Sequence, residues 1–196
     1  MTAIPYFIFT AVIARSAKMF DEKLRNELVR MAREDSEMRE TLLQSGKLPK
    51  NGYAEEMRRI HEKNNARMRK IIEQNGWTGR SLVGEDGGEA AWLIVQHAVL
   101  EPDFQRQCLP LLEQAVAVGE APGWQLAYLT DRVLMREGKE QVYGTQYIPV
   151  KGGKSVVYKI ADPENVDARR QSVGLCWLEE NTKRINREDE LLNEKL

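Results

Sequence analysis

Helical periodicity in five long segments is the feature that most constrains how this chain can fold. In each segment apolar residues recur at intervals of three and four, which places their side chains on one face of an α-helix. Glycine follows most of these segments closely, as is usual at the C-terminal end of a helix. The segments cover about residues 19–44, 53–74, 89–100, 103–118 and 124–136, and residues 76–88 are expected to form a loop.

The pattern changes after the fifth segment. The runs QVYGTQYIPV and SVVYKI are rich in β-branched and aromatic residues, and they predict a small β-hairpin near residues 141–160, turned on Gly152-Gly153. Two more helices are expected, a short one that begins at Asp162-Pro163 and a charged amphipathic one over about residues 177–192. The chain is therefore predicted to be mainly α, with a single bundle-like domain of about six to seven helices and one hairpin.

Composition excludes several classes of protein. A chain of 196 residues can bury roughly 70% of its extended surface, which is enough for one core. The net charge of -1 argues against a general nucleic-acid binder, so no nucleic-acid partner is expected. The two cysteines lie far apart without metal-type spacing, which predicts neither a disulfide framework nor a zinc site.

Residues 1–14 (MTAIPYFIFTAVIA) form an uncharged apolar extension before the domain, which we place at residues 15–196. The extension is too short to span a bilayer and has no basic region of a secretory signal, so we expect a cytoplasmic protein without stable membrane insertion. Its apolar side chains are expected to pack on the core or on a second subunit. A homodimer formed through this extension is one expectation.

Polar side chains interrupt the apolar face of four different helices. Asp35, for example, lies between Met31 and Met38 on the apolar stripe of the first helix. An unsatisfied buried polar group costs about 1–3 kcal/mol, and the inner faces of a bundle point at one another. We therefore expect these groups to meet in one cavity. They are Asp35 in the first helix, His61 and Asn64 in the second, His97 in the third and Asp131 in the fifth.

An imidazole beside a carboxylate predicts general acid–base chemistry, because the carboxylate fixes the ring tautomer and raises its basicity. His97 is the predicted base, with Asp131 or Asp35 as its orienting carboxylate. Asn64 is expected to hydrogen-bond in the same cavity. No cofactor is expected, although two histidines and two aspartates could alternatively bind zinc or iron. Against a metal, neither histidine has a ligand partner at the usual helical spacing, apart from Glu101 past the end of the helix.

The predicted hairpin offers a second polar group. Strand alternation would place Tyr143 and Thr145 on one face and Gln146 on the other, where they could line a substrate pocket. The pair Arg169-Arg170 could grip a carboxylate or phosphate, although salt bridges to neighbouring acids are the ordinary alternative. The predicted substrate-binding residues are Asn64, His61, Arg132, Tyr143, Thr145, Gln146, Arg169 and Arg170.

Four motifs carry a resemblance to a known family. They are AAWLIVQHA (residues 90–98), AYLTDRV (127–133), QVYGTQY (141–147) and DPENVDARRQSVGL (162–175). With these motifs the chain resembles an uncharacterised bacterial domain family of unknown function over about residues 28–178. The resemblance implies a single domain and supplies no mechanism.

Two functions from different classes fit these observations. The first is an enzyme that acts on a small polar molecule by acid–base catalysis, as a hydrolase or as a cyclase or lyase. The second is a non-catalytic module that binds a ligand or docks another protein, as a resistance, immunity or regulatory partner would. The uneven distribution of charge and the apolar extension would then serve as an interface.

Overall fold

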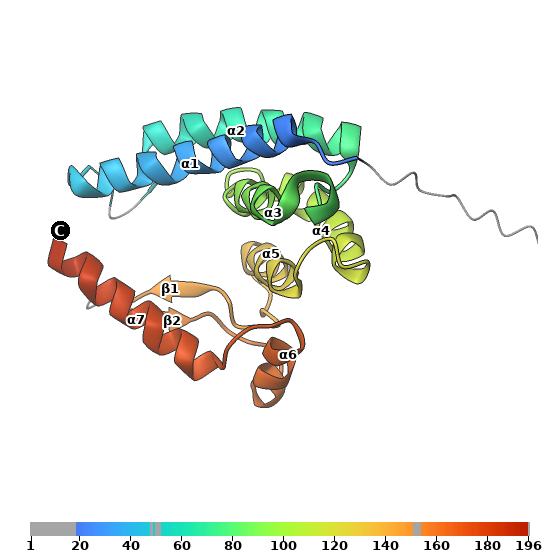
Figure 1. Cartoon of the computed structure of the whole chain (residues 1–196). Coiled ribbons are helices and arrows are strands. Elements are labelled where there is room, and N and C mark those ends of the chain that lie inside the picture. The colour runs from blue at the N-terminus through green and yellow to red at the C-terminus, as the bar shows by residue number, and fades with distance from the viewer. Residues whose placement is uncertain (1–18, 48, 50–51, 151–153, 196) are drawn as a thin grey trace, which may run out of the picture.

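Seven α-helices and one two-stranded antiparallel sheet make up the described part of the chain, residues 19–47, 49, 52–150 and 154–195 of a computed structural model (Figure 1). The prediction of a mainly α fold with a small hairpin is confirmed. The helices are α1 (Glu22–Gln44), α2 (Glu55–Asn75), α3 (Arg80–Gln96), α4 (Pro102–Ala117), α5 (Gly123–Arg136), α6 (Val166–Ser172) and α7 (Leu178–Lys195). The strands are β1 (Tyr147–Pro149) and β2 (Ser155–Val157), and a 3₁₀ turn, η1, covers Pro163–Asn165. Residues 1–14 and the expected Gly152-Gly153 turn lie outside the described residues.

The helices α1 and α2 lie side by side and pack across α3 (Figure 1). On the other side of α3 come α4 and α5, and the hairpin, α6 and α7 lie beyond α5. The core is shared by the first five helices, and each contributes a side chain that is completely buried. These side chains are Leu28, Met68, Val95, Leu112 and Leu129, all 0% exposed. Packing of the apolar stripes on one another therefore accounts for the arrangement of α1 to α5.

The third helix begins nine residues earlier than its apolar periodicity predicts. The glycine-rich segment expected to be a loop is helical from Arg80, and Gly84 (φ 74°, ψ 173°) interrupts the helix with a kink. Leu82 and Val83 are buried in the core, and the Leu82 carbonyl accepts a hydrogen bond of 2.8 Å from the Asp21 N–H. Tertiary packing thus overrides the low helix propensity of glycine in this segment.

The hairpin is much shorter than predicted. β1 and β2 pair over three residues each, with Ile148 opposite Val156. Gln141 forms an isolated bridge with Ile160, and residues 142–146 form a loop, so the alternation expected for a strand does not apply to them. Gly144 turns this loop in the left-handed conformation (φ 67°), which favours glycine.

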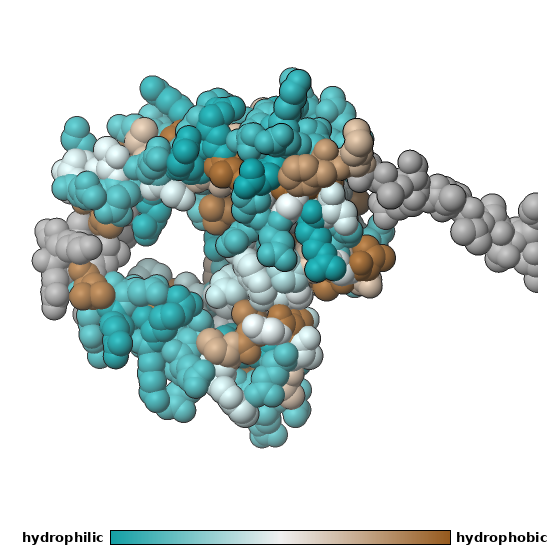
Figure 2. All heavy atoms as spheres, in the orientation of Figure 1, coloured by the Kyte–Doolittle hydropathy of each residue, from teal (hydrophilic) through white to brown (hydrophobic). Residues whose placement is uncertain are grey.

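Figure 2 shows the molecule hollowed between the α1–α2 layer and the layer formed by the hairpin and α7. Among the residues that the structure describes, none of the helices combines the length and the apolar character that a membrane crossing requires.

Candidate functional site

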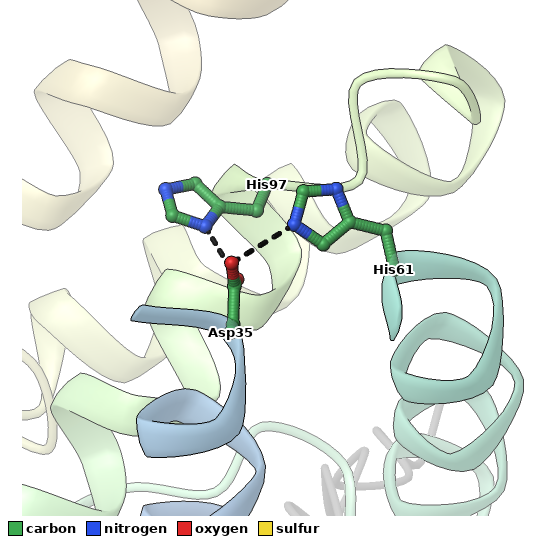
Figure 3. A group of neighbouring side chains, drawn as sticks. All are labelled: Asp35, His61 and His97. Carbon is green, nitrogen blue, oxygen red and sulfur yellow. Dashed lines mark hydrogen bonds and ion pairs between the residues drawn. The ribbon is translucent and has the colours of Figure 1, made fainter. Parts of the chain in front are cut away.

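Three helices bring Asp35, His61 and His97 together (Figure 3). Asp35 comes from α1 and His61 from α2, and His97 is the C-cap residue that directly follows α3. His61 Nε2 lies 3.1 Å from Asp35 Oδ1, and His97 Nδ1 lies 2.6 Å from Asp35 Oδ2. The exposed fraction of the side chain rises from 1% for Asp35 to 10% for His61 and 32% for His97. The cluster therefore runs from a buried carboxylate to an accessible imidazole.

The protonation of this cluster follows from the charge of Asp35. Burial opposes ionisation of this carboxyl, but the hydrogen bonds from His61 and His97 outweigh burial and hold its pKa well below its usual range. An ionised carboxylate only accepts hydrogen bonds, so each facing ring nitrogen carries a proton. His97 is thus held with its proton on Nδ1, and Nε2, which points away from Asp35 in Figure 3, is left as its basic atom.

Tyr53 completes the environment of His61. Its hydroxyl contacts His61 Nδ1, and burial raises the pKa of Tyr53 to about 12. The hydroxyl therefore stays protonated and donates to Nδ1, because the other nitrogen of His61 already donates to Asp35. Both nitrogens of His61 are engaged, which separates its role from that of His97. Tyr53 begins the segment that periodicity predicts as the second helix, but in the structure it precedes α2, and no motif singled it out.

A pocket of about 280 Å³ opens over the cluster. It lies between the C-terminal half of α1, the start of α2 and the end of α3, and the side chains around it include one cation, Arg39. Its described lining residues are Asp35, Arg39, Pro49, Gly52, Tyr53, Ala54, Met57, His61, His97 and Val99. A volume of this size suits a small molecule.

Asn64 is buried close to the cluster but bonds elsewhere. Its Nδ2 donates to the Met31 carbonyl at 3.3 Å, one turn before Asp35. Its Oδ1 has no hydrogen-bond partner among the described residues. Arg132 of α5 binds the buried Gln96. The amide of Gln96 is oriented with its oxygen towards the guanidinium, and this oxygen accepts from Arg132 Nε at 2.7 Å.

The structure places Asp131 away from the histidine pair, so the expected pairing of Asp131 with His97 is not observed. Its Oδ1 accepts from the Val142 N–H at 2.7 Å, and its Oδ2 accepts from the N–H and the hydroxyl of Thr145, each at 2.9 Å. The Tyr143 N–H also donates to this carboxylate. Asp131 is 0% exposed, and it holds the loop after α5 in place. The orienting carboxylate of His97 is Asp35, the other candidate.

The remaining predicted binding residues gather around this second aspartate. Thr145 bonds to Asp131, and Gln146 Nε2 donates to the Thr145 hydroxyl at 3.0 Å. Arg170 is 1% exposed and donates to the backbone carbonyls of Cys176 and Tyr143 at 2.6 and 2.8 Å.

Arg169 likewise donates to the carbonyls of Val142 and Ala161, and it pairs with Asp162. Arg169 and Arg170, which were expected to bind an anion, thus donate to backbone carbonyls of the chain. Short loops leave many such carbonyls without a partner in a strand or helix.

The same three residues of the first cluster could also hold a metal ion. One nitrogen from each histidine and one carboxylate oxygen of Asp35 lie within 4.8 Å of one another. Two imidazoles and one carboxylate are ligands typical of iron and zinc, and the hydroxyl of Tyr53 on His61 would act as an outer partner. Sequence spacing could not indicate this set because each ligand comes from a different helix.

Comparisons with known proteins add a family but no activity. No curated protein and no solved structure matches the chain. One family model matches residues 22–191, and its description is a family of unknown function, DUF6624. The cluster of Asp35, His61 and His97 and the group of residues around Asp131 both lie within the matched residues. The chain therefore belongs to the DUF6624 family of unknown function.

Proposed function

We propose that this protein is an enzyme that acts on a small polar molecule by general acid–base catalysis, with His97 as the proton-transferring group. The observation that carries the proposal is the hydrogen bond of 2.6 Å between His97 Nδ1 and the buried, ionised Asp35 at the wall of a pocket. A buried carboxylate bound to Nδ1 is the arrangement that positions an imidazole for catalysis and stabilises the imidazolium formed during it.

In the proposed mechanism His97 Nε2 accepts a proton from a water molecule or from a hydroxyl or C–H group of the substrate. Asp35 stabilises the positive charge that develops on the ring, and the proton is then given to the leaving group. Asp35 is a positioning residue in this scheme, since it acts through His97. His61 shares the Asp35 carboxylate and, with Tyr53, fixes its orientation.

The nucleophile is assigned to water or to the substrate itself. Among the described residues that line the pocket, none is a serine, threonine or cysteine. Hydrolysis by activated water, elimination and intramolecular cyclisation all need only a proton acceptor and donor in this position. The proposal therefore covers a hydrolase and a cyclase or lyase.

A metal-dependent hydrolase is the second candidate, and the convergence of three ligand atoms within 4.8 Å is the observation that favours it. Asp35, His61 and His97 would hold the divalent ion, which would supply an activated water for hydrolysis, so that His97 would serve as a ligand and not as the base.

The test uses the full chain and a mixture of small cellular metabolites, followed by mass spectrometry. The wild type is compared with His97→Asn and with the matched control His61→Asn, which changes the histidine whose nitrogens are both engaged. Loss of the proton-transfer group is expected to slow conversion about 10²–10⁴-fold. The control is expected to slow it less.

Each outcome separates the candidates. Conversion that survives His97→Asn unchanged overturns the proposal. Depletion of a metabolite by tight binding without a product supports the non-catalytic module. Conversion that is abolished by a chelator and restored by zinc or iron supports the metal-dependent candidate and overturns the metal-free mechanism.

Two further expectations stay predictions. The first is a cytoplasmic location. The second is a homodimer formed through residues 1–14, which size measurements on the full chain and on a chain without these residues would test.

A further inference from the structure

Arg39 is the one cation among the described residues that line the pocket over Asp35, His61 and His97. It follows Asp35 by four residues on α1, so the two residues lie on the same face of the helix, about 6 Å apart along its axis. Helical side chains lean towards the N-terminal end of their helix, so a long side chain at position 39 covers the turn that carries Asp35. Arg39 therefore belongs to the same pocket wall as the pair of Asp35 and His97.

Arg39 differs from the other arginines of α1 in having no counter-charge. It forms no hydrogen bond or ion pair with any residue that the structure describes, and its side chain is exposed. The three other arginines of this helix each have an acidic partner, as Arg25 has Asp86, Arg30 has Glu34 and Arg33 has Glu37. The unpaired arginine of α1 is thus the one that lines the pocket.

Asp35 does not pair with Arg39, although it is the carboxylate one turn before it. Its Oδ1 accepts from His61 Nε2, and its Oδ2 accepts from His97 Nδ1. Asp35 is also the one carboxylate among the described lining residues. Because both of its oxygens are engaged by imidazoles, the acceptor that a guanidinium in this pocket lacks would have to come from a ligand.

The start of α2 adds to the positive charge around the pocket. Tyr53, Ala54 and Met57 from this end of the helix line the wall, whereas the acidic Glu55 and Glu56 do not. Ala54 is the N-cap residue and makes no side-chain hydrogen bond to the first turn. The N–H groups of that turn therefore keep the partial positive charge of a helix N-terminus, which favours an anion as Arg39 does.

We infer that the substrate of this pocket carries a carboxylate or phosphate group, which Arg39 binds while the reacting part of the molecule lies at His97. The planar guanidinium presents parallel N–H donors that match both kinds of oxyanion. The charged group and the reacting atom of the substrate would then lie about one helical turn apart. The inference rests on the proposed function in taking this pocket as the reactive one, but binding of the anion does not require proton transfer by His97.

The binding experiment uses the two histidines of the chain, both of which lie in the cluster. Their ring signals are followed by NMR while the full chain, dialysed against a chelating resin, is titrated with sodium phosphate and, separately, with sodium malonate. Sodium chloride of equal ionic strength serves as the reference. A saturable shift of the His97 signal is expected with at least one of the two anions, and the more effective one identifies the phosphate or the carboxylate class.

Two variants and a matched control test the role of Arg39. Arg39→Gln is expected to weaken anion binding about tenfold, as the loss of a hydrogen bond to a charged group does. Arg39→Lys keeps the charge but loses the planar fork, so an intermediate affinity is expected. Arg33→Gln removes the same charge from an exposed arginine of the same helix that does not line the pocket, and it should keep the wild-type affinity.

Four results would overturn the inference. They are the absence of a saturable shift with either anion, an equal shift with chloride alone, wild-type affinity in Arg39→Gln, and an equal loss of affinity in Arg33→Gln. A tenfold loss confined to the Arg39 variants supports it.

Two measurements separate this inference from the proposed function. His97→Asn should still bind the anion by calorimetry while conversion is lost, and loss of binding in this variant would mean that His97 holds the anion in place of Arg39. Where the wild type converts a metabolite, Arg39→Gln should raise KM about tenfold and change kcat less. An unchanged KM would overturn the inference and leave the catalytic proposal standing. Anion binding through Arg39 without any conversion would do the reverse.

Discussion

Asp35 and Asp131 interrupt apolar helix faces in the same way, and both are buried, with 1% and 0% of the residue exposed. Their partners differ. Asp131 binds backbone N–H groups and one hydroxyl of its own downstream loop, and none of these groups titrates near neutral pH. Asp35 binds two imidazoles, one of which reaches a pocket.

A buried carboxylate therefore indicates chemistry only through the groups that it binds. Backbone donors make it part of the architecture, and titratable, accessible partners make it part of a site. The arginines divide in the same way. Arg170 donates to carbonyls around the second aspartate, whereas Arg132 binds only the neutral amide of Gln96 among the residues that the structure describes.

The largest expected effect is on the free energy of unfolding when each aspartate is truncated. Asp131→Ala is expected to cost about 3–5 kcal/mol, because several buried donors lose their acceptor at once. Asp35→Ala should cost about 1–2 kcal/mol, because water from the pocket can reach the exposed histidine. Urea denaturation at pH 7 measures both, and an equal cost would remove the distinction between the two regions.

The arginines give the next largest effect. Arg170→Met should lose about 2–4 kcal/mol of the free energy of unfolding, since carbonyls such as those of Tyr143 and Cys176 lose a charged donor. Arg132→Met should change it by less than about 1 kcal/mol, or stabilise the fold, because it removes an uncompensated cation. Urea denaturation measures both variants. A large loss of the free energy of unfolding in Arg132→Met would show that Arg132, like Arg170, serves mainly to hold the fold together.

A smaller effect is expected in acid. The pKa of Asp35 is lower in the folded chain than its ordinary value of 3.8, so its ionised form stabilises the fold above that pH. This contribution is lost as the pH falls below about 4, where the unfolded chain takes up the proton first. Asp35→Asn should therefore lose less stability than the wild type between pH 5 and pH 2.

The control for this measurement is Glu179→Gln. Lys183 also lowers the pKa of Glu179, but this pair is exposed on α7 and screened by solvent. Its stability profile in acid should follow that of the wild type. A profile of Asp35→Asn that did the same would show that Asp35 is not stabilised as an ion.

The smallest effect is expected for Tyr53→Phe. Removing one partly exposed hydrogen bond should cost about 1 kcal/mol or less. Nitrogen NMR should show a changed tautomer balance for His61, because its Nδ1 loses a donor, and an unchanged Nδ1–H tautomer for His97. A tautomer change at His97 instead would mean that the two imidazoles do not act separately.

The sequence was a good guide to which face of a helix a residue occupies and a poor guide to which faces meet. Periodicity placed Asp35, His61 and Asp131 on interior faces, and the structure buries all three. Whether His97 meets Asp35 or Asp131 depends on how the helices pack, and nothing in local spacing encodes that. The two aspartates were therefore equivalent candidates.

Local signals also misled where tertiary contacts dominate. Residues 141–147 have strand-like composition, but Asp131 accepts hydrogen bonds from the N–H groups of Val142, Tyr143 and Thr145. Residues 142–146 therefore form a loop, and β1 begins only at Tyr147. The glycines between Gly76 and Gly88 predicted a loop, and core packing of Val83 made most of the segment helical. Short or glycine-rich segments carry too little pattern to resist such contacts.

Asp131 and Arg132 are neighbours on α5, and consecutive residues of a helix project about 100° apart around its axis. Core packing of Ala127, Leu129 and Val133 fixes the rotation of α5 about its axis. That one rotation turns Asp131 towards the following loop and Arg132 towards Gln96. A single helix thus serves both polar regions, although they share no bond.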